Sequence, residues 1–283
     1  MKKGASFFSF AEDVNLSEAM DQMKKAGYNG VELVLGGTGE LTMDTTDQQL
    51  QRIAAMAGDY GLEIPSVGTW LLWANNVVSP DEKERETCRD IMRKQLDSAA
   101  AFGADTILIV PGYCGTEFAQ DKPLVRYDDA YQRARDSIAM VAEHAEKVKV
   151  SIGLENVWNR FLLSPIEVRR LIDEIGSDYV GAYFDVGNIM YIGYPQHWIE
   201  ILDKRIRKIH FCDYRTSQAG LGAFVDMLAG DVPYGAVMDS LKSIGYDDYI
   251  IYEMLPNYPA HPYQSMINGF KSMCKVFEDA GVS

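Results

Sequence analysis

Four predicted β-strands in the second half of the chain each end in a side chain that can bind a metal ion. Successive apolar runs reach Glu155, Asp185, His210 and Glu253. Three carboxylates brought to one point would repel each other, and burial would raise their pKa values, unless a cation neutralised them. Three oxygen ligands and one imidazole suit a divalent ion. The sequence therefore predicts one bound metal ion, Mn²⁺ foremost, with Mg²⁺, Co²⁺ and Zn²⁺ as the other candidates.

The four residues can meet only if their strands lie side by side, and a repeated pattern indicates that they do. A helical segment ends in Gly, and a short β-branched or aromatic run follows, as at Gly27, Gly61, Gly103 and Gly245. Such alternation predicts parallel strands joined by right-handed crossovers. We expect eight strands, at residues 4–10, 30–35, 62–67, 105–110, 148–154, 180–184, 206–211 and 249–252.

Helix signals lie between these strands. Asp47 precedes an apolar stripe, residues 80–102 have one apolar side, and Ser164-Pro165 is typical of a helix start. Eight strand–helix units in 283 residues predict an α/β fold, a (β/α)8 TIM barrel spanning residues 1–283 as a single domain. The competing fold, a doubly wound open sheet, would usually show a glycine-rich phosphate turn. The run at residues 36–39 lacks its spacing.

Composition restricts the partners and the location. Lys and Arg number 27 against 41 Asp and Glu, so the net charge of −14 disfavours nucleic acid and anionic membranes. No apolar stretch approaches the roughly 20 residues of a membrane span. The four cysteines have no metal-site spacing and are typical of free thiols in a reducing compartment. We expect a cytoplasmic protein with a small-molecule substrate.

Five segments resemble the xylose-isomerase-like TIM-barrel superfamily. They are Ala26-Gly-Tyr-Asn-Gly-Val-Glu32, Leu154-Glu-Asn-Val-Trp158, Tyr183-Phe-Asp-Val-Gly-Asn188, His210-Phe-Cys-Asp-Tyr-Arg215 and Tyr252-Glu253. The nearest branch is that of the sugar phosphate isomerases and epimerases, relatives of the ketose 3-epimerases. The resemblance spans nearly the whole chain and is specific for the superfamily and its metal site, but not for the substrate.

The resemblance implies one divalent metal held by Glu155, Asp185, His210 and Glu253, with the two glutamates moving the proton next to a ketone. A metal that binds the carbonyl and adjacent hydroxyl oxygens of a sugar would stabilise an enediolate. One glutamate would then abstract the proton and the other return it on the opposite face, which inverts the carbon. The expected activity is that of an isomerase or epimerase of carbohydrate metabolism, acting on a keto-sugar or its phosphate.

Two positions depart from the epimerase pattern. Asn188 stands where the epimerases carry a His, and Phe161 stands where they carry a substrate-binding Glu. Asn188 could still bind a sugar hydroxyl, whereas the apolar Phe161 predicts a different substrate pose. The Asn, which replaces a His ligand, also argues against the superfamily's trinuclear-zinc nucleases.

Further substrate contacts are predicted at strand ends. Arg215 is a candidate anion or hydroxyl contact, or alternatively the salt-bridge partner of Asp213. Trp70, Tyr113 and Trp158 are candidates for a pocket wall on which a sugar face could stack.

Two other functions fit the same residues. The first is a metal-dependent lyase, either a dehydratase or the large subunit of a C-glycoside deglycosidase acting on a 3-keto-glycoside. The second, which the intact ligand set disfavours, is a non-catalytic binding subunit. We expect a homo-oligomer, or a hetero-oligomer with a small subunit in the deglycosidase case.

Overall fold

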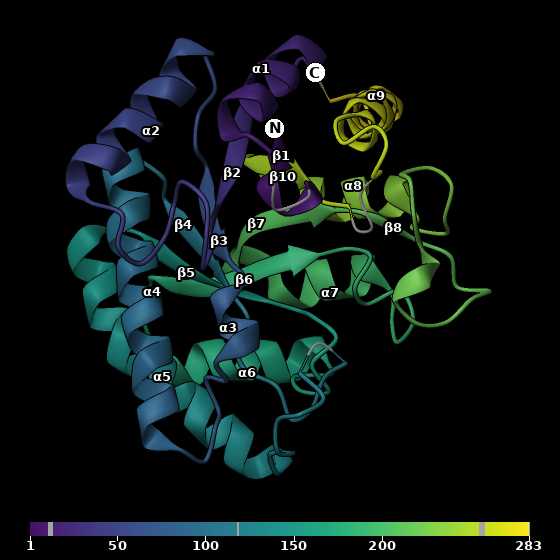
Figure 1. Ribbon diagram of the computed structural model, residues 1–283. Coiled ribbons are helices and arrows are strands. Elements are labelled where there is room, and N and C mark those ends of the chain that lie inside the picture. Colours follow the sequence, from purple (N-terminus) through teal and green to yellow (C-terminus); the bar gives the residue numbers. More distant parts are fainter. Residues whose placement is uncertain (11–13, 118, 255–257, 283) are drawn as a thin grey trace.

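Eight parallel strands form a closed barrel with helices around it (Figure 1). The computed structural model describes residues 1–10, 14–117, 119–254 and 258–282. Each strand pairs with its neighbours in the chain, and the ring closes where β1 pairs with β10. The barrel strands are β1 Lys2–Ser6, β2 Gly30–Leu35, β3 Ser66–Thr69, β4 Thr106–Ile109, β5 Ser151–Glu155, β6 Val180–Asp185, β7 Ile206–Phe211 and β10 Tyr249–Tyr252. The predicted single-domain TIM barrel is confirmed.

Helices cover the outside of the barrel, and α9 lies beside α1 where the ring closes (Figure 1). No helix among the described residues is both long enough and apolar enough to cross a membrane. The helices are α1 Leu16–Ala26, α2 Asp47–Asp59, α3 Leu71–Ala74, α4 Glu82–Phe102, α5 Tyr127–Val148, α6 Pro165–Ile175, α7 Pro195–Leu202, α8 Tyr234–Ser243 and α9 Gln264–Asp279.

The signals at the helix ends act as their chemistry predicts. Gly27 and Gly103 take left-handed φ angles of 111° and 75° after α1 and α4, a conformation that costs glycine little. Ser164 begins α6 with a reciprocal pair of hydrogen bonds to Glu167, and Pro165 occupies the first turn. Helix α2 begins one residue earlier than its acidic signal suggested, because Thr46 is its cap.

Three predicted strands differ from the observed ones by more than one residue at an end. The first strand covers Lys2–Ser6 rather than residues 4–10, because the Ser6 hydroxyl caps a 3₁₀ turn at Phe7–Ser9. The third begins at Ser66 rather than at residue 62, because Pro65 has no N–H to give to a strand ladder. The fifth begins at Ser151, since α5 continues to Val148 and Lys149 ends it with a φ of 60°.

The barrel interior is divided between apolar and polar layers. Phe8, Leu108, Tyr249 and Ile251 belong to a small apolar cluster that is distinct from the larger core between strands and helices. Glu32, Ser66, Tyr183 and His210 are all completely buried and are joined by hydrogen bonds to Glu32. Buried polar groups of this kind have to be hydrogen-bonded to one another, and that requirement sets the geometry of the site.

One short hairpin was not predicted from the sequence. It follows β7 and consists of β8 Asp213–Tyr214 and β9 Phe224–Val225, which pair antiparallel. The buried Asp213 carboxylate accepts hydrogen bonds from the backbone N–H groups of Tyr214, Leu228, Gly230 and Val232. This one side chain therefore holds together the loop that covers one side of the barrel mouth.

Candidate metal centre

The four predicted ligands converge at the carboxyl ends of four adjacent strands. Glu155 ends β5, Asp185 ends β6, His210 lies in β7, and Glu253 follows β10. One donor atom from each of the four lies within 4.8 Å of the others. The Asp185 and His210 residues are 1% and 0% exposed, whereas the Glu253 side chain is 16% exposed. The donors therefore line a nearly buried point that is reached from the side of Glu253.

His210 has the orientation of a metal-binding imidazole. Its Nε2 atom lies 2.9 Å from Glu32 Oε1 and is placed to donate a hydrogen bond to that carboxylate. Its Nδ1 atom is buried, lies 2.9 Å from Glu253 Oε2 and 3.5 Å from Glu155 Oε1, and makes no hydrogen bond with the described residues. With a proton on Nε2, the lone pair of Nδ1 points at the carboxylates, as in carboxylate–histidine–metal arrangements.

Glu32 is itself fixed by two hydroxyl groups. Ser66 Oγ donates to Glu32 Oε2 at 2.6 Å, and the Tyr183 hydroxyl donates to the same oxygen. Burial alone would raise the pKa of Glu32, but the charge and hydrogen bonds of His210, with the two hydroxyls, outweigh burial and lower that pKa. Glu32 is therefore held as an anion that orients the imidazole.

Without a bound cation, burial and mutual repulsion disfavour the charged forms of the ligand carboxylates. Burial raises the pKa of Glu155 to about 8, and the charge of Glu253 adds to this effect. Burial, followed by repulsion from Glu253, raises the pKa of Asp185 to about 6 even though the Asn188 N–H donates to Asp185 Oδ1 at 2.6 Å. Burial lowers the pKa of His210, but the charges of Glu253 and Glu32 outweigh burial and raise it, so without an ion the imidazole holds a proton among the carboxylates. Burial and repulsion among the carboxylates both favour a cation at this point, and an ion bound at Nδ1 would take the place of that proton. The residues therefore fit a divalent metal ion.

A cavity of about 510 Å³ opens above these ligands. Glu155, Asp185 and Glu253 form its polar floor. Three of the predicted substrate contacts, Asn188, Trp158 and Trp70, line its walls. Its other walls include Trp73, Phe8 and Phe224. The floor can bind polar atoms while the walls offer aromatic faces.

Two predicted contacts and Phe161 lie away from this cavity. Tyr113 is completely buried, stacks on Trp73 and donates its hydroxyl hydrogen to the Trp73 carbonyl, so it supports the wall from behind. Arg215 donates to the carbonyl of Ala229 at 2.7 Å, whereas the Asp213 carboxylate accepts from backbone N–H groups. Phe161 packs edge-on against Tyr127 and is buried.

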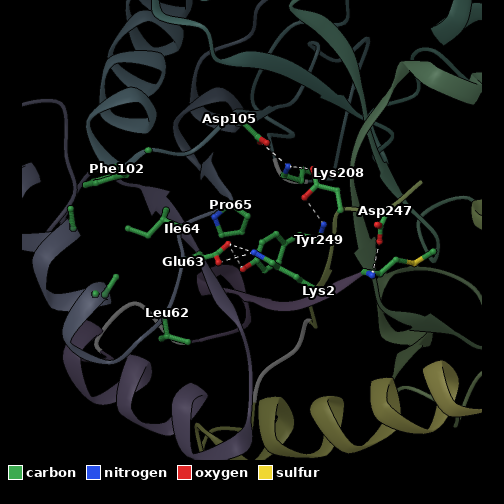
Figure 2. Close-up of a pocket in the computed structure, with 16 residues that line it drawn as sticks. Lys2, Leu62, Glu63, Ile64, Pro65, Phe102, Asp105, Lys208, Asp247 and Tyr249 are labelled. Atoms are coloured by element: carbon green, nitrogen blue, oxygen red, sulfur yellow. Dashed lines mark hydrogen bonds and ion pairs between the residues drawn. The ribbon is translucent and has the colours of Figure 1, made fainter. Parts of the chain in front are cut away.

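A second cavity, of about 660 Å³, lies at the opposite end of the barrel (Figure 2). Its charged groups are already paired with one another. Lys208, which is 1% exposed, lies 2.7 Å from Asp105 and 2.5 Å from Asp248, while Lys2 lies 2.7 Å from Glu63. Residues at the amino ends of barrel strands usually serve stability, and these paired charges agree with that role.

Two residues near the ligands had no assigned role in the sequence analysis. Glu32 was detectable as a carboxylate within the apolar strand 30–35, where burial requires a partner. Cys212 directly follows β7, and its Sγ lies 3.2 Å from each Asp185 oxygen. A lone cysteine carries no such signal in sequence, because its partner is set by the register between β6 and β7.

Curated relatives are similar over most of the chain. The "Putative L-ribulose-5-phosphate 3-epimerase SgbU" of Escherichia coli strain K12 is 25% identical over 96% of this chain and 95% of its own. The inosose dehydratase of Lacticaseibacillus casei is 24% identical over 86% of this chain and 83% of its own.

Solved structures show the same fold. A D-psicose 3-epimerase crystallised in the presence of D-fructose has a TM-score of 0.80 at 16% identity, covering 99% of this chain and 100% of its own. The IolI protein with a bound zinc atom has a TM-score of 0.78 at 18% identity, covering 99% of both chains. The model of the xylose isomerase-like TIM barrel family matches residues 20–282. The chain belongs to the xylose isomerase-like TIM barrel family.

Proposed function

We propose that the protein is a divalent-metal-dependent isomerase or epimerase of a keto-sugar, with Glu155 and Glu253 as the acid–base pair. The single observation that carries this proposal is the convergence of Glu155, Asp185, His210 and Glu253, with the unpaired His210 Nδ1 facing the carboxylates. The epimerase names among its relatives support the reaction class.

The metal would be held by these four side chains. When bound, a divalent ion supplies Lewis acidity that stabilises negative charge on the substrate oxygens. The oxygen-rich ligand set supports Mn²⁺, and the zinc atom in the IolI structure supports Zn²⁺ as the alternative. Glu32 would fix the imidazole so that its Nδ1 lone pair stays directed at the ion.

The two glutamates flank the other ligands. In the barrel order β10-β7-β6-β5, Glu253 and Glu155 come from the outer two strands, and both line the cavity. A sugar carbon between them would present one face to each carboxylate. One carboxylate would remove the proton beside the ketone, and the other would return a proton to the opposite face. Asn188 and Trp158 would orient the sugar by a hydrogen bond and by stacking.

A lyase is the second candidate, since inosose dehydratases are among the relatives. It would use the same proton abstraction and then expel a leaving group from the next carbon. The cytoplasmic location and the oligomeric assembly expected from the sequence stay predictions.

Incubation with a panel of ketoses and Mn²⁺ in D₂O, followed by NMR, tests the proposal. We expect deuterium at the carbon beside the ketone in an isomeric product. Loss of water or of an aglycone would favour the lyase. Absence of exchange on every substrate, with metal shown to be bound, would contradict both enzymatic candidates.

A further inference from the structure

A smaller cavity adjoins the one above the metal centre at the barrel mouth. It measures about 290 Å³ and shares Val157, Trp158, Asn188 and Leu221 with the larger cavity. We call the larger the inner basin and the smaller the outer basin. Because the same four residues line both, one extended ligand could occupy the two basins at once. Ligand sites of roughly 300–1,000 Å³ accommodate molecules considerably larger than a single sugar ring.

The inner basin does not suit a phosphate group. Its acidic lining residues are Glu155, Asp185 and Glu253, and no Lys or Arg of the described ranges lines it. A phosphate there would lack the charged donors that such groups usually find in proteins. A neutral sugar, by contrast, could give its oxygens to a bound ion and its C–H faces to the tryptophans.

The outer basin is unusually apolar for a surface site. Leu163, Tyr191 and Ile192 line it and are 50%, 59% and 56% exposed. Large apolar side chains gathered on a surface in this way mark a binding site more often than an accident of packing. The only charged side chains among its described lining residues are Glu117 and Arg160, which have opposite signs.

Trp158 forms the wall between the basins and is held in place. Its Nε1 donates to the Asn188 carbonyl at 3.0 Å, and its ring centroid lies 6.3 Å from that of Tyr191 at an interplanar angle of 34°. The Trp158 ring is therefore fixed, and together with the tilted, exposed Tyr191 ring it forms an aromatic corner. A planar apolar group fits such a corner better than a flexible polar chain does.

We propose that the substrate is a neutral sugar that carries a second, planar apolar group, as an aryl glycoside does. The sugar would lie in the inner basin and the apolar group in the outer basin. This inference rests on the proposed function for the sugar's position, and on the shared walls of the two basins for the position of the apolar group.

Binding to the Mn²⁺-loaded full-length protein tests the inference without requiring turnover. Titration calorimetry would compare phenyl β-D-glucopyranoside, methyl β-D-glucopyranoside and D-glucose 6-phosphate. We expect the phenyl glucoside to bind about 10-fold more tightly than the methyl glucoside, since burial of one aromatic ring contributes at least that factor. Equal affinity of the two glucosides, or tighter binding of the phosphate, would overturn the inference.

A matched pair of variants locates the effect. Ile192 lines the outer basin and Ile166 lines neither basin, yet both are 56% exposed. Ile192→Ser should reduce the preference for the phenyl glucoside several-fold and leave binding of the methyl glucoside unchanged. Ile166→Ser should alter neither. An equal effect of both variants would overturn the assignment of the outer basin.

Two results would separate this inference from the proposed function. Deuterium exchange on simple ketoses without a phenyl preference would overturn only the inference. A phenyl preference without exchange on any sugar would overturn only the proposed reaction. If Ile192→Ser instead abolished self-association of the protein, and the phenyl glucoside showed no preference, a second copy of the chain would be the occupant and the inference would fail.

Discussion

Replacement of Glu32 by Gln should weaken metal binding while the barrel stays folded. Glu32 touches no predicted substrate position, and its carboxylate accepts from His210 Nε2 at 2.9 Å. The Gln side chain has the same size, so its carbonyl oxygen could still accept that hydrogen bond. Its amide group would face the hydroxyls of Ser66 and Tyr183, which can accept a hydrogen bond as well as donate one. The variant therefore removes the charge with little change in packing.

The expected magnitude follows from the role of that charge. An anion beside Nε2 raises the basicity of the imidazole, and changes at such positions typically cost 10–100-fold in metal affinity. Because the Gln can keep the hydrogen bond, we expect a loss near the lower end, about 10-fold, or roughly 1.4 kcal/mol. Truncation by Glu32→Ala would lose the bond as well and should lie nearer 100-fold.

Competition between the protein and a chelator for Zn²⁺ would measure this change. Glu63→Gln is the matched control, because Glu63 also accepts from a cation and a tyrosine, Lys2 and Tyr249, but at the opposite end of the barrel. It should leave metal affinity unchanged. Parental affinity in a folded Glu32→Gln protein would refute the reasoning that His210 binds the ion through Nδ1 under the control of Glu32.

Three other predictions concern the ligands and one helix cap. Metal affinity, titrated at pH 6, 7 and 8, should rise with pH, because Asp185 and Glu155, with pKa values of about 6 and 8, must lose protons to bind the ion. The metal-free protein should lose stability over the same range, because these carboxyl groups hold their protons more tightly in the folded than in the unfolded state. Glu155→Gln or Glu253→Gln should cut turnover 10²–10⁴-fold in steady-state assays. Near-parental turnover of either variant would show that the replaced glutamate is a metal ligand and not an acid–base group. Ser164→Ala should cost about 1 kcal/mol in urea unfolding, and no change would contradict the capping role.

The barrel was predictable because its pattern is local and repeated. Strands such as β4 and β10 are buried over their whole length, so they appear in sequence as apolar runs after a helix-ending glycine. The strand bounds failed where a backbone donor was missing, as at Pro65, or where a helix ran on, as at Val148. The β8–β9 hairpin could not be predicted, since it depends on hydrogen bonds of Asp213 with backbone N–H groups 15 to 19 residues further along the same loop.

The candidate ligands were predictable for a related reason. Each lies at or near the end of a strand, so the topology alone places the four together. The wall residues were harder, because whether an aromatic side chain faces the cavity depends on its rotamer and on its neighbours. Tyr113 points behind Trp73, and Arg215 turns to the Ala229 carbonyl, and neither orientation follows from spacing along the chain.

The central claim is that one ion is held by Glu155, Asp185, His210 and Glu253, and metal stoichiometry tests it most directly. Elemental analysis after exhaustive dialysis should find one divalent ion per chain in the parent protein. Asp185→Ala and His210→Ala should retain none, while circular dichroism shows an intact barrel. Two or three tightly bound ions per chain, or one ion retained by either folded variant, would contradict the account.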